Sequence, residues 1–280
     1  MVDELTPSPP LPNPSPSRGE GLNVTPLPIA ATPATPLPSR ERGRGRGGAA
    51  PNPGQHHFSD QASLVATLGS RVISQLQNAI EQRGQAMLAV SGGKTPAALF
   101  DWLSQQSLDW NKVFITLADD RWLPPNHADS NTRLVRQHLL QGPAAAAHFT
   151  PLVNAAPTPE KGLAQAIERF NALPQPFDLI LLGMGDDGHT ASLFPCAPQL
   201  PQALSSSEPL VAIHPQTAPY GRISLSPAAL RQSRQNILLI SGASKQAVLQ
   251  QALQDGPLEQ MPVRLLWQAG MPPLAVYWAA

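Results

Sequence analysis

The sequence predicts an α/β fold in which a mainly parallel, doubly wound sheet is covered by helices on both faces. Two observations predict this fold: short apolar runs of strand length alternate with segments of helical periodicity, and the runs are apolar at nearly every position. Strands that alternate with helices form parallel sheets, whose strands are apolar throughout because both faces of the sheet are buried. We therefore expect three layers, helix on sheet on helix, of the Rossmann-like kind.

The predicted domain begins at Phe58, and a tail of different composition precedes it. Residues 1–57 contain 13 of the 33 prolines and almost no clusters of aliphatic side chains. Such a segment cannot bury enough apolar surface to offset the entropy that folding costs, so we expect residues 1–57 to be disordered and residues 58–280 to form one domain. An arginine- and glycine-rich run at residues 40–46 leaves open a nucleic-acid or partner-binding arm, although the tail has no aromatic side chain for base stacking.

The first predicted helix has an apolar side chain at every fourth position from residue 64 to residue 80, and Ser59 or Asp60 is its expected cap. Six apolar runs then predict strands, at residues 86–90, 113–117, 178–182, 210–213, 236–240 and 274–278. Helical patterns separate most of them, at residues 96–103, 131–140, 159–173 and 245–253.

The charge balance and the single cysteine exclude several classes of protein. Lysine plus arginine equals aspartate plus glutamate at 19 each, so no global charge favours nucleic acid or an anionic membrane. Cys196 is the only cysteine, which excludes an intramolecular disulfide and suits a reducing compartment. No apolar run approaches the roughly 18–20 residues that span a bilayer, and no secretory signal is recognisable. We expect a cytoplasmic protein.

The turn after the run at residues 86–90 has the sequence SGGKTP, at residues 91–96. Its two glycines permit a tight turn with exposed backbone amides, and Thr95 is a possible cap for the helix that follows. A helix that begins at the ligand-binding end of a sheet favours anions, so we expect a phosphate site here. It is not the nucleotide-binding P-loop, which needs a glycine at the position of Leu88. An ordinary strand-to-helix turn is the alternative.

Charged residues also follow the run at residues 113–117. Residues 118–124 have the sequence ADDRWLP, in which carboxylates can orient water or a sugar hydroxyl and the guanidinium of Arg121 can bind phosphate. A surface ion pair of little energetic consequence is the alternative. The sequence Asp-Ser-Asn at residues 129–131 is first of all typical of a helix cap, and only second of a binding element.

The densest group of functional residue types is GMGDDGHTASLFP, at residues 183–195. It contains a formal GxGxxG, but Pro195 follows too soon for the long helix of a dinucleotide site, and no acid closes the next apolar run. His189 is a candidate general base, because an unperturbed imidazole has a pKa near 6.5 and is largely neutral in the cytosol. No histidine spacing typical of a metal site is present, and neither is the GxSxG of serine hydrolases.

Two further basic residues lie in or just after predicted strands. Arg222 begins the segment RISLS at residues 222–226, and Lys245 opens the last predicted helix after a turn that contains Gly242. Most such side chains are solvated surface charges. Their positions make them candidates for binding a phosphate group.

Residues 58–280 resemble the 6-phosphogluconolactonases of the bacterial type. That family shows an SGG(S)TP loop, DERxVP, an SN pair, GxDGHTASLFP, an arginine-led strand and a G-x-x-K turn, in this order. The corresponding segments here are residues 91–96, 119–124, 130–131, 185–195, Arg222 and 242–245. The resemblance implies the doubly wound fold, hydrolysis of a sugar-phosphate lactone, and no metal or organic cofactor. It implies a small-molecule substrate rather than nucleic acid or membrane; we expect a monomer or a small homo-oligomer.

The resemblance also implies roles for individual residues. His189 would be the base that activates water for attack on the lactone, and Asp119 would orient that histidine, the water or the sugar. Arg121, Arg222 and Lys245 would bind the phosphate or polarise the lactone. The remaining substrate-binding candidates are Gly92, Gly93, Lys94, Thr95 and Asn131. Lys94 stands where the family commonly has serine and Asp120 where it usually has glutamate, so the roles of these two side chains stay open.

Two alternatives to the lactonase remain. Glucosamine-6-phosphate deaminases are similar in fold, but their corresponding string resembles GHIAFNEP, with a glutamate that assists ring opening, and no acid follows His189 within its loop here. A non-catalytic sugar-phosphate sensor is the second alternative. Such sensors often lose the catalytic base or gain a DNA-binding module, whereas His189 is present and the only extension is the tail.

Overall fold

The structure, a computed structural model, describes residues 54–280. Within them, a parallel sheet of seven strands has the order β1-β10-β9-β6-β2-β3-β5. The strands are β1 (Gly54–Phe58), β2 (Ala86–Val90), β3 (Val113–Leu117), β5 (His148–Thr150), β6 (Leu179–Leu182), β9 (Asn236–Ser241) and β10 (Leu274–Ala279). The predicted parallel sheet is confirmed.

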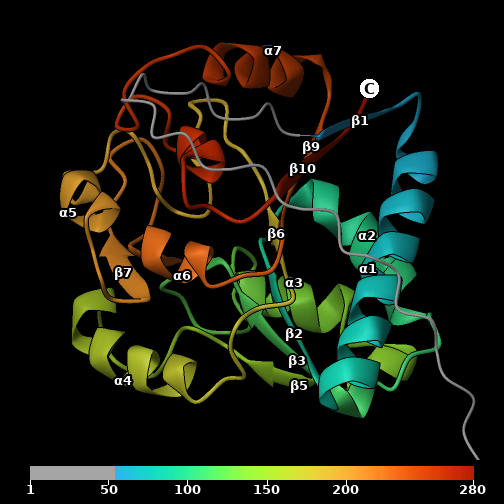
Figure 1. The fold of residues 1–280 in the computed structure, drawn as a ribbon. Helices are drawn as coiled ribbons and strands as arrows, with labels where there is room; N and C mark the ends of the chain where they lie inside the picture. Colours follow the sequence, from blue (N-terminus) through green and yellow to red (C-terminus); the bar gives the residue numbers. More distant parts are fainter. Residues whose placement is uncertain (1–53) are drawn as a thin grey trace, which may run out of the picture. The chain divides into compact units, whose positions relative to one another are not determined.

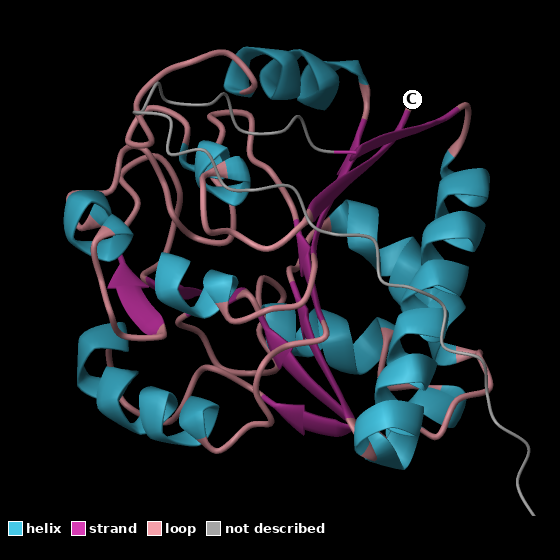
Figure 2. Cartoon of the chain, viewed as in Figure 1, coloured by secondary structure: helices cyan, strands magenta, loops and turns pink. Residues whose placement is uncertain are grey.

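Helices cover both faces of this sheet, which confirms the predicted three-layer α/β architecture. Figure 1 shows α1 (Gln61–Arg83) and α2 (Lys94–Ser104) on one side, and α4 (Pro159–Asn171), α5 (Leu200–Leu204) and α6 (Pro227–Arg231) on the other; Figure 2 shows the same arrangement with the strands between the helices. The other helices are α3 (Asn131–His138), α7 (Ala243–Ala252) and the 3₁₀ helices η1 (Trp110–Lys112), η2 (Gly142–Ala146) and η3 (Pro262–Trp267). None of the helices in residues 54–280 combines the length and the apolarity needed to cross a membrane.

The domain begins earlier than the predicted boundary at Phe58. Strand β1 pairs in parallel with β10, from Gly54 opposite Ala275 to Phe58 opposite Ala279, so residues 54–57 belong to the sheet. An edge strand needs no apolar pattern, and only Gln55 and Phe58 are even partly buried in β1, which explains why the sequence did not predict it. Residues 54–57 of the segment 1–57, predicted to be disordered, thus form part of a strand, and residues 1–53 lie outside the described residues.

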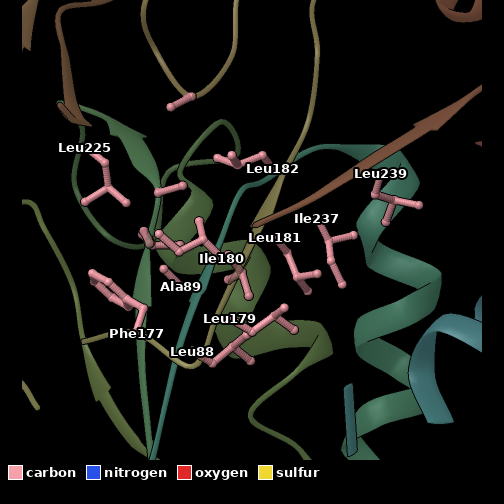
Figure 3. Packing of buried hydrophobic residues seen from close by; sticks show 14 of the residues in the cluster. Leu88, Ala89, Phe177, Leu179, Ile180, Leu181, Leu182, Leu225, Ile237 and Leu239 are labelled. Atoms are coloured by element: carbon pink, nitrogen blue, oxygen red, sulfur yellow. The ribbon is translucent and has the colours of Figure 1, made fainter. Parts of the chain in front are cut away.

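Helix α1 has the predicted cap and the predicted apolar face. The carboxylate of Asp60 accepts a hydrogen bond from the backbone amide of Ser63 at 2.8 Å. The positions that recur every fourth residue are buried against the sheet and α2. Figure 3 shows how the side chains of the central strands β2, β6 and β9 pack together, among them Leu88, Ile180 and Ile237.

A second, smaller sheet follows the carboxyl end of the parallel sheet, which is where ligands bind in folds of this kind. Its antiparallel strands have the order β4 (Asp119–Arg121), β8 (Arg222–Leu225) and β7 (Leu210–Ile213). The predicted strand at 210–213 therefore exists but lies outside the parallel sheet. Ala118 joins the two sheets, because its amide donates to Val90 in β2 while its carbonyl accepts from Leu225 in β8. The chain thus leaves β3 at the carboxyl end of the sheet and enters β4 directly.

Candidate active site

The residues that follow β2, β3, β6 and β9 line one cavity of about 520 Å³. The carboxyl ends of parallel strands meet at one edge of a sheet, and ligands bind there in folds of this kind. All ten site residues predicted from the sequence line this cavity: Gly92, Gly93, Lys94, Thr95, Asp119, Arg121, Asn131, His189, Arg222 and Lys245. The structure therefore brings them together, whatever the role of each.

The turn after β2 requires its two glycines. Gly93 has φ of 115°, and a Cβ built on Gly92 would overlap the amide group of Asn131. Asn131 is held there because its Nδ2 donates to the carbonyl of Asp119 at 2.9 Å. The turn and the start of α3 therefore meet without room for any side chain at residue 92.

Helices α2 and α7 both begin at the cavity without a side-chain cap. Their N-caps are Gly93 and Gly242, whereas α1, α3 and α4 are capped by Asp, Ser and Thr. The expectation that Thr95 caps α2 is wrong, because α2 starts at Lys94; the Thr95 hydroxyl instead lies 3.0 Å from that of Ser241, at the end of β9.

The first turns of α2 and α7 carry Lys94 and Lys245 and no acidic residue. The positive end of a helix dipole disfavours cations, so lysines at two uncapped helix starts create a concentrated positive potential. Lys245 is paired with Asp186 at 2.8 Å, and the Asp186 side chain is largely exposed. This part of the cavity is suited to an anionic ligand that displaces or joins that carboxylate.

His189 is held in one orientation by its own loop. The Oδ1 atom of Asp187 lies 2.6 Å from Nδ1 of His189 and accepts from the His189 backbone amide at 3.1 Å. The imidazole also stacks on the ring of Phe194, with 3.9 Å between ring centroids. An ionised carboxylate can only accept, so Nδ1 carries the proton and Nε2 keeps its lone pair. The ring is positioned as a base.

The pKa of Asp187 lies below its usual value. Burial of the carboxyl raises this pKa, but the hydrogen bonds from His189 and the attraction of an imidazolium outweigh burial. Asp187 therefore stays ionised wherever His189 accepts a proton. From the sequence, the resemblance implied Asp119 as the orienting carboxylate and Asp187 was missed, although an aspartate two residues before a histidine in a glycine-rich turn was the available signal.

Asp119 faces the same cavity but contacts a different group. Its Oδ2 accepts a hydrogen bond from the hydroxyl of Ser192 at 2.6 Å, and the amide of Ser192 donates to the hydroxyl of Ser224. All three side chains are buried. This network links β4 and β8 to the loop that carries His189.

The side chain of Asp120 does not line the cavity and instead stabilises the fold. It is fully buried, and its carboxylate accepts from the backbone amides of Asn131 and Thr132 at the start of α3. Burial raises the pKa of Asp120, and these hydrogen bonds partly oppose the change. Asp120, whose role the sequence left open, therefore holds the start of α3 beside β4.

Two arginines lie directly opposite each other across the small sheet. Arg121 of β4 pairs with Arg222 of β8, and like charges at such positions destabilise a sheet. Within residues 54–280 neither guanidinium forms an ion pair with a carboxylate, and the buried Nε of each has no hydrogen-bond partner. An anionic ligand would relieve both features.

Arg222 is the more buried of the two and rests on the ring of Phe194, with its Cζ 5.5 Å from the ring centroid. Burial lowers the pKa of Arg222 and the charge of Arg121 lowers it further, while Asp119 and two other aspartates act in the opposite direction. A free arginine loses its proton only in strongly alkaline solution, so the side chain remains a cation. Phe194 thus contacts both the imidazole of His189 and the guanidinium of Arg222.

The structure does not favour the other sites considered from the sequence. The loop at residues 183–199 contains no α-helix, and α5 begins only at Leu200, so its glycines open no helix for a dinucleotide. In the part of the chain that is described, no group of three or more histidine, cysteine, aspartate and glutamate side chains is arranged to hold a metal ion.

The chain matches known proteins over nearly all of the described domain. Residues 59–277 match the family model described as "Glucosamine-6-phosphate isomerases/6-phosphogluconolactonase". A 6-phosphogluconolactonase from Pseudomonas aeruginosa is 42% identical over 216 residues, which cover 75% of this chain and 88% of that protein.

Solved structures agree with this match. The crystal structure of a 6-phosphogluconolactonase from Shewanella baltica superposes with a TM-score of 0.81 at 45% identity, covering 83% of this chain and 100% of that one. A monomeric glucosamine-6-phosphate deaminase superposes with a TM-score of 0.64 at 18% identity, covering 81% and 97%, which shows a common fold alone.

The ring orientation of His189 depends on the absence of a side chain at Gly185. A Cβ built on Gly185 would overlap Nδ1 of His189, whereas one on Gly183 meets nothing within 4 Å. We expect Gly185→Ala to displace the imidazole and break its contact with Asp187, and Gly183→Ala to leave it intact. Nitrogen-15 NMR of the imidazole measures this: the Nδ1-protonated tautomer should persist in Gly183→Ala and be lost in Gly185→Ala. The same tautomer in both variants would contradict the geometry.

Proposed function

We propose that this chain, which belongs to the family of glucosamine-6-phosphate isomerases and 6-phosphogluconolactonases, hydrolyses 6-phospho-D-glucono-1,5-lactone to 6-phospho-D-gluconate. This is the lactonase step in the oxidative branch of the pentose phosphate pathway. One observation carries the proposal: His189, fixed by Asp187 with Nε2 free, lines the same cavity as two arginines and two lysines. A base and several cations in one cavity suit the hydrolysis of an ester that bears a phosphate group.

His189 acts as the general base. Nε2 takes a proton from water while the water oxygen bonds to C1 of the lactone, and the tetrahedral intermediate then breaks its bond between C1 and the ring oxygen. The imidazolium returns its proton to that ring oxygen, which leaves as a hydroxyl. Asp187 stabilises the imidazolium during the step and keeps Nδ1 as the protonated nitrogen. The remaining carboxylic acid ionises in solution.

The cations bind the phosphate and stabilise the negative charge that develops on the carbonyl oxygen. Lys245 and the amides at the starts of α2 and α7 form one positive region, and Arg121 with Arg222 forms another. Cations held in fixed positions stabilise a developing oxyanion strongly because they need not reorganise during the reaction. We assign Lys94, Thr95 and Asn131 to substrate binding with them, on the basis of their places in the cavity lining.

Asp119 orients the attacking water or a sugar hydroxyl. Its Oδ2 is occupied by Ser192, so Oδ1 is the oxygen available to a ligand. This assignment keeps the sequence-based role for water or sugar, while Asp187 takes the contact with the histidine.

The chain acts as a monomer or a small homo-oligomer in the cytoplasm, without a metal or organic cofactor and without a nucleic-acid or membrane partner. The balanced charge and the single cysteine support this part of the proposal.

Lactone disappearance tests the proposed reaction against its nearest rival. The lactone is generated freshly from glucose 6-phosphate, and its decay is followed with and without the protein. We expect decay well above the spontaneous rate, and no ammonia from glucosamine 6-phosphate. Ammonia release without lactone decay would show that the protein is a deaminase and not a lactonase. Binding of 6-phosphogluconate with neither activity would indicate a sensor.

Replacing the base should remove turnover and leave binding. We expect His189→Ala to lower kcat by about 10²–10⁴-fold, the usual contribution of a positioned general base, because no other group takes the proton. Calorimetric affinity for 6-phosphogluconate should change little. His138→Ala is the matched control, since this histidine pairs with Asp101 and does not line the cavity. Near-parental kcat in His189→Ala would disprove the assignment of the base.

The pH profile follows from the state of Asp187. Its lowered pKa keeps the carboxylate of Asp187 ionised throughout pH 5–8, so protonation of this carboxylate does not contribute to the profile there. Because a protonated imidazole cannot accept a proton from water, kcat should be lower at pH 5 than at pH 8. Initial rates, corrected for spontaneous hydrolysis at each pH, measure it; a flat profile is incompatible with the mechanism.

A further inference from the structure

We infer that Tyr220 is a positioning residue that fixes the paired arginines for the substrate. The inference rests on the proposed function for the identity of the ligand. Tyr220 lies in the connection between β7 and β8, at residues 214–221, and was not among the candidates predicted from the sequence. Its hydroxyl donates to Oδ2 of Asp129 at 3.2 Å, across to the connection between β4 and α3. Both residues line the cavity.

This hydrogen bond closes a ring of contacts around the two guanidiniums. Arg121 donates from Nη1 to the backbone carbonyl of Asp129 at 2.5 Å, and Arg222 donates from Nη2 to that of Pro219 at 3.1 Å. Arg121 and Arg222 are themselves partners across the ladder of β4 and β8. We call the five residues Arg121, Asp129, Pro219, Tyr220 and Arg222 the arginine clasp.

Each loop of the arginine clasp is thus tied to one arginine by a carbonyl. The backbone amide of Trp122 donates to the carbonyl of Gly221 where the loops leave the small sheet, and the Tyr220 hydroxyl joins the two loops farther from it. Without that hydroxyl, the side chain of Asp129 has no other hydrogen bond across to residues 214–221 among the described contacts. Two guanidiniums that repel each other are therefore held side by side by contacts made before a ligand arrives. Preorganised binding groups cost less to order on binding, so the affinity for an anion rises.

The backbone of Tyr220 supports a functional role. Only two residues other than glycine have positive φ in residues 54–280, Ala191 at 49° and Tyr220 at 71°, and both line the cavity. Such conformations cost free energy and persist where the surrounding contacts enforce them, often at binding sites. Burial of the side chain does not offset the cost of this backbone conformation, because Tyr220 is 40% exposed. Among the large hydrophobic residues of the described domain, it is the exposed one. The edge of its ring meets His127, with 5.7 Å between centroids.

Tyr220→Phe tests the clasp, because it removes one hydroxyl and keeps the ring. We expect KM for the lactone and the calorimetric Kd for 6-phosphogluconate to rise together by about 3- to 10-fold, because the hydrogen bond to Asp129 is lost. The kcat should stay within twofold of the parent, because this hydrogen bond affects binding and not the chemical step. Tyr277→Phe is the matched control: Tyr277, the only other tyrosine, is buried in β10 and does not line the cavity. It should leave KM and Kd unchanged.

A double-mutant cycle separates positioning from a general structural effect. In an Arg222→Ala background the clasp is already open, so adding Tyr220→Phe should change Kd by less than twofold. Tyr220→Gly adds a folding control, because glycine accepts the positive φ: it should weaken binding at least as much as Tyr220→Phe while its melting temperature stays no lower than that of the parent.

Unchanged Kd and KM in Tyr220→Phe, or full additivity with Arg222→Ala, would overturn the inference. The binding arm uses 6-phosphogluconate and needs no turnover, so its result stands apart from that of the lactonase assay. A parent protein that does not hydrolyse the lactone overturns the proposed function; an active parent with an unaffected Tyr220→Phe overturns only the clasp.

Discussion

Two arginines of like charge face each other across β4 and β8, and much of the cavity is arranged around this constraint. The pairing is possible because the chain leaves the parallel sheet at Ala118 and starts a second sheet at once. The aromatic ring of Phe194 lies against the guanidinium of Arg222, and three aspartates oppose the lowering of its pKa by burial and by Arg121. A sheet that holds such a pair needs compensation, and a ligand with negative charge supplies it.

The same segments position His189, the proposed base. The loop after β6 carries His189, Asp187 and Phe194, so the ring that supports the imidazole also supports a guanidinium. Ser192 of that loop binds Asp119 of β4. The base and the cations are therefore coupled through short, buried contacts and are not independent surface groups.

The sequence predicted those elements whose pattern is local and apolar. Strands β2, β3, β6, β9 and β10 lie within a residue or two of their predicted positions because both their faces are buried, which leaves a run of apolar residues. Strands β1, β4 and β5 were missed, since the two edge strands β1 and β5 and the polar segment Asp119–Arg121 carry no such signal. For the site, strand ends and the resemblance located all ten candidates in the cavity. The bond between Tyr220 and Asp129 joins residues 91 positions apart, and no local pattern encodes it.

The central claim is that one ligand contacts the base and the cations at the same time. A crystal structure of the protein with 6-phosphogluconate tests it most directly. We expect C1 of the ligand to lie next to the imidazole of His189, with the phosphate in contact with cations among Arg121, Arg222, Lys94 and Lys245. A phosphate at His189 with the carboxylate on the cations, or a ligand bound outside the cavity, would contradict it.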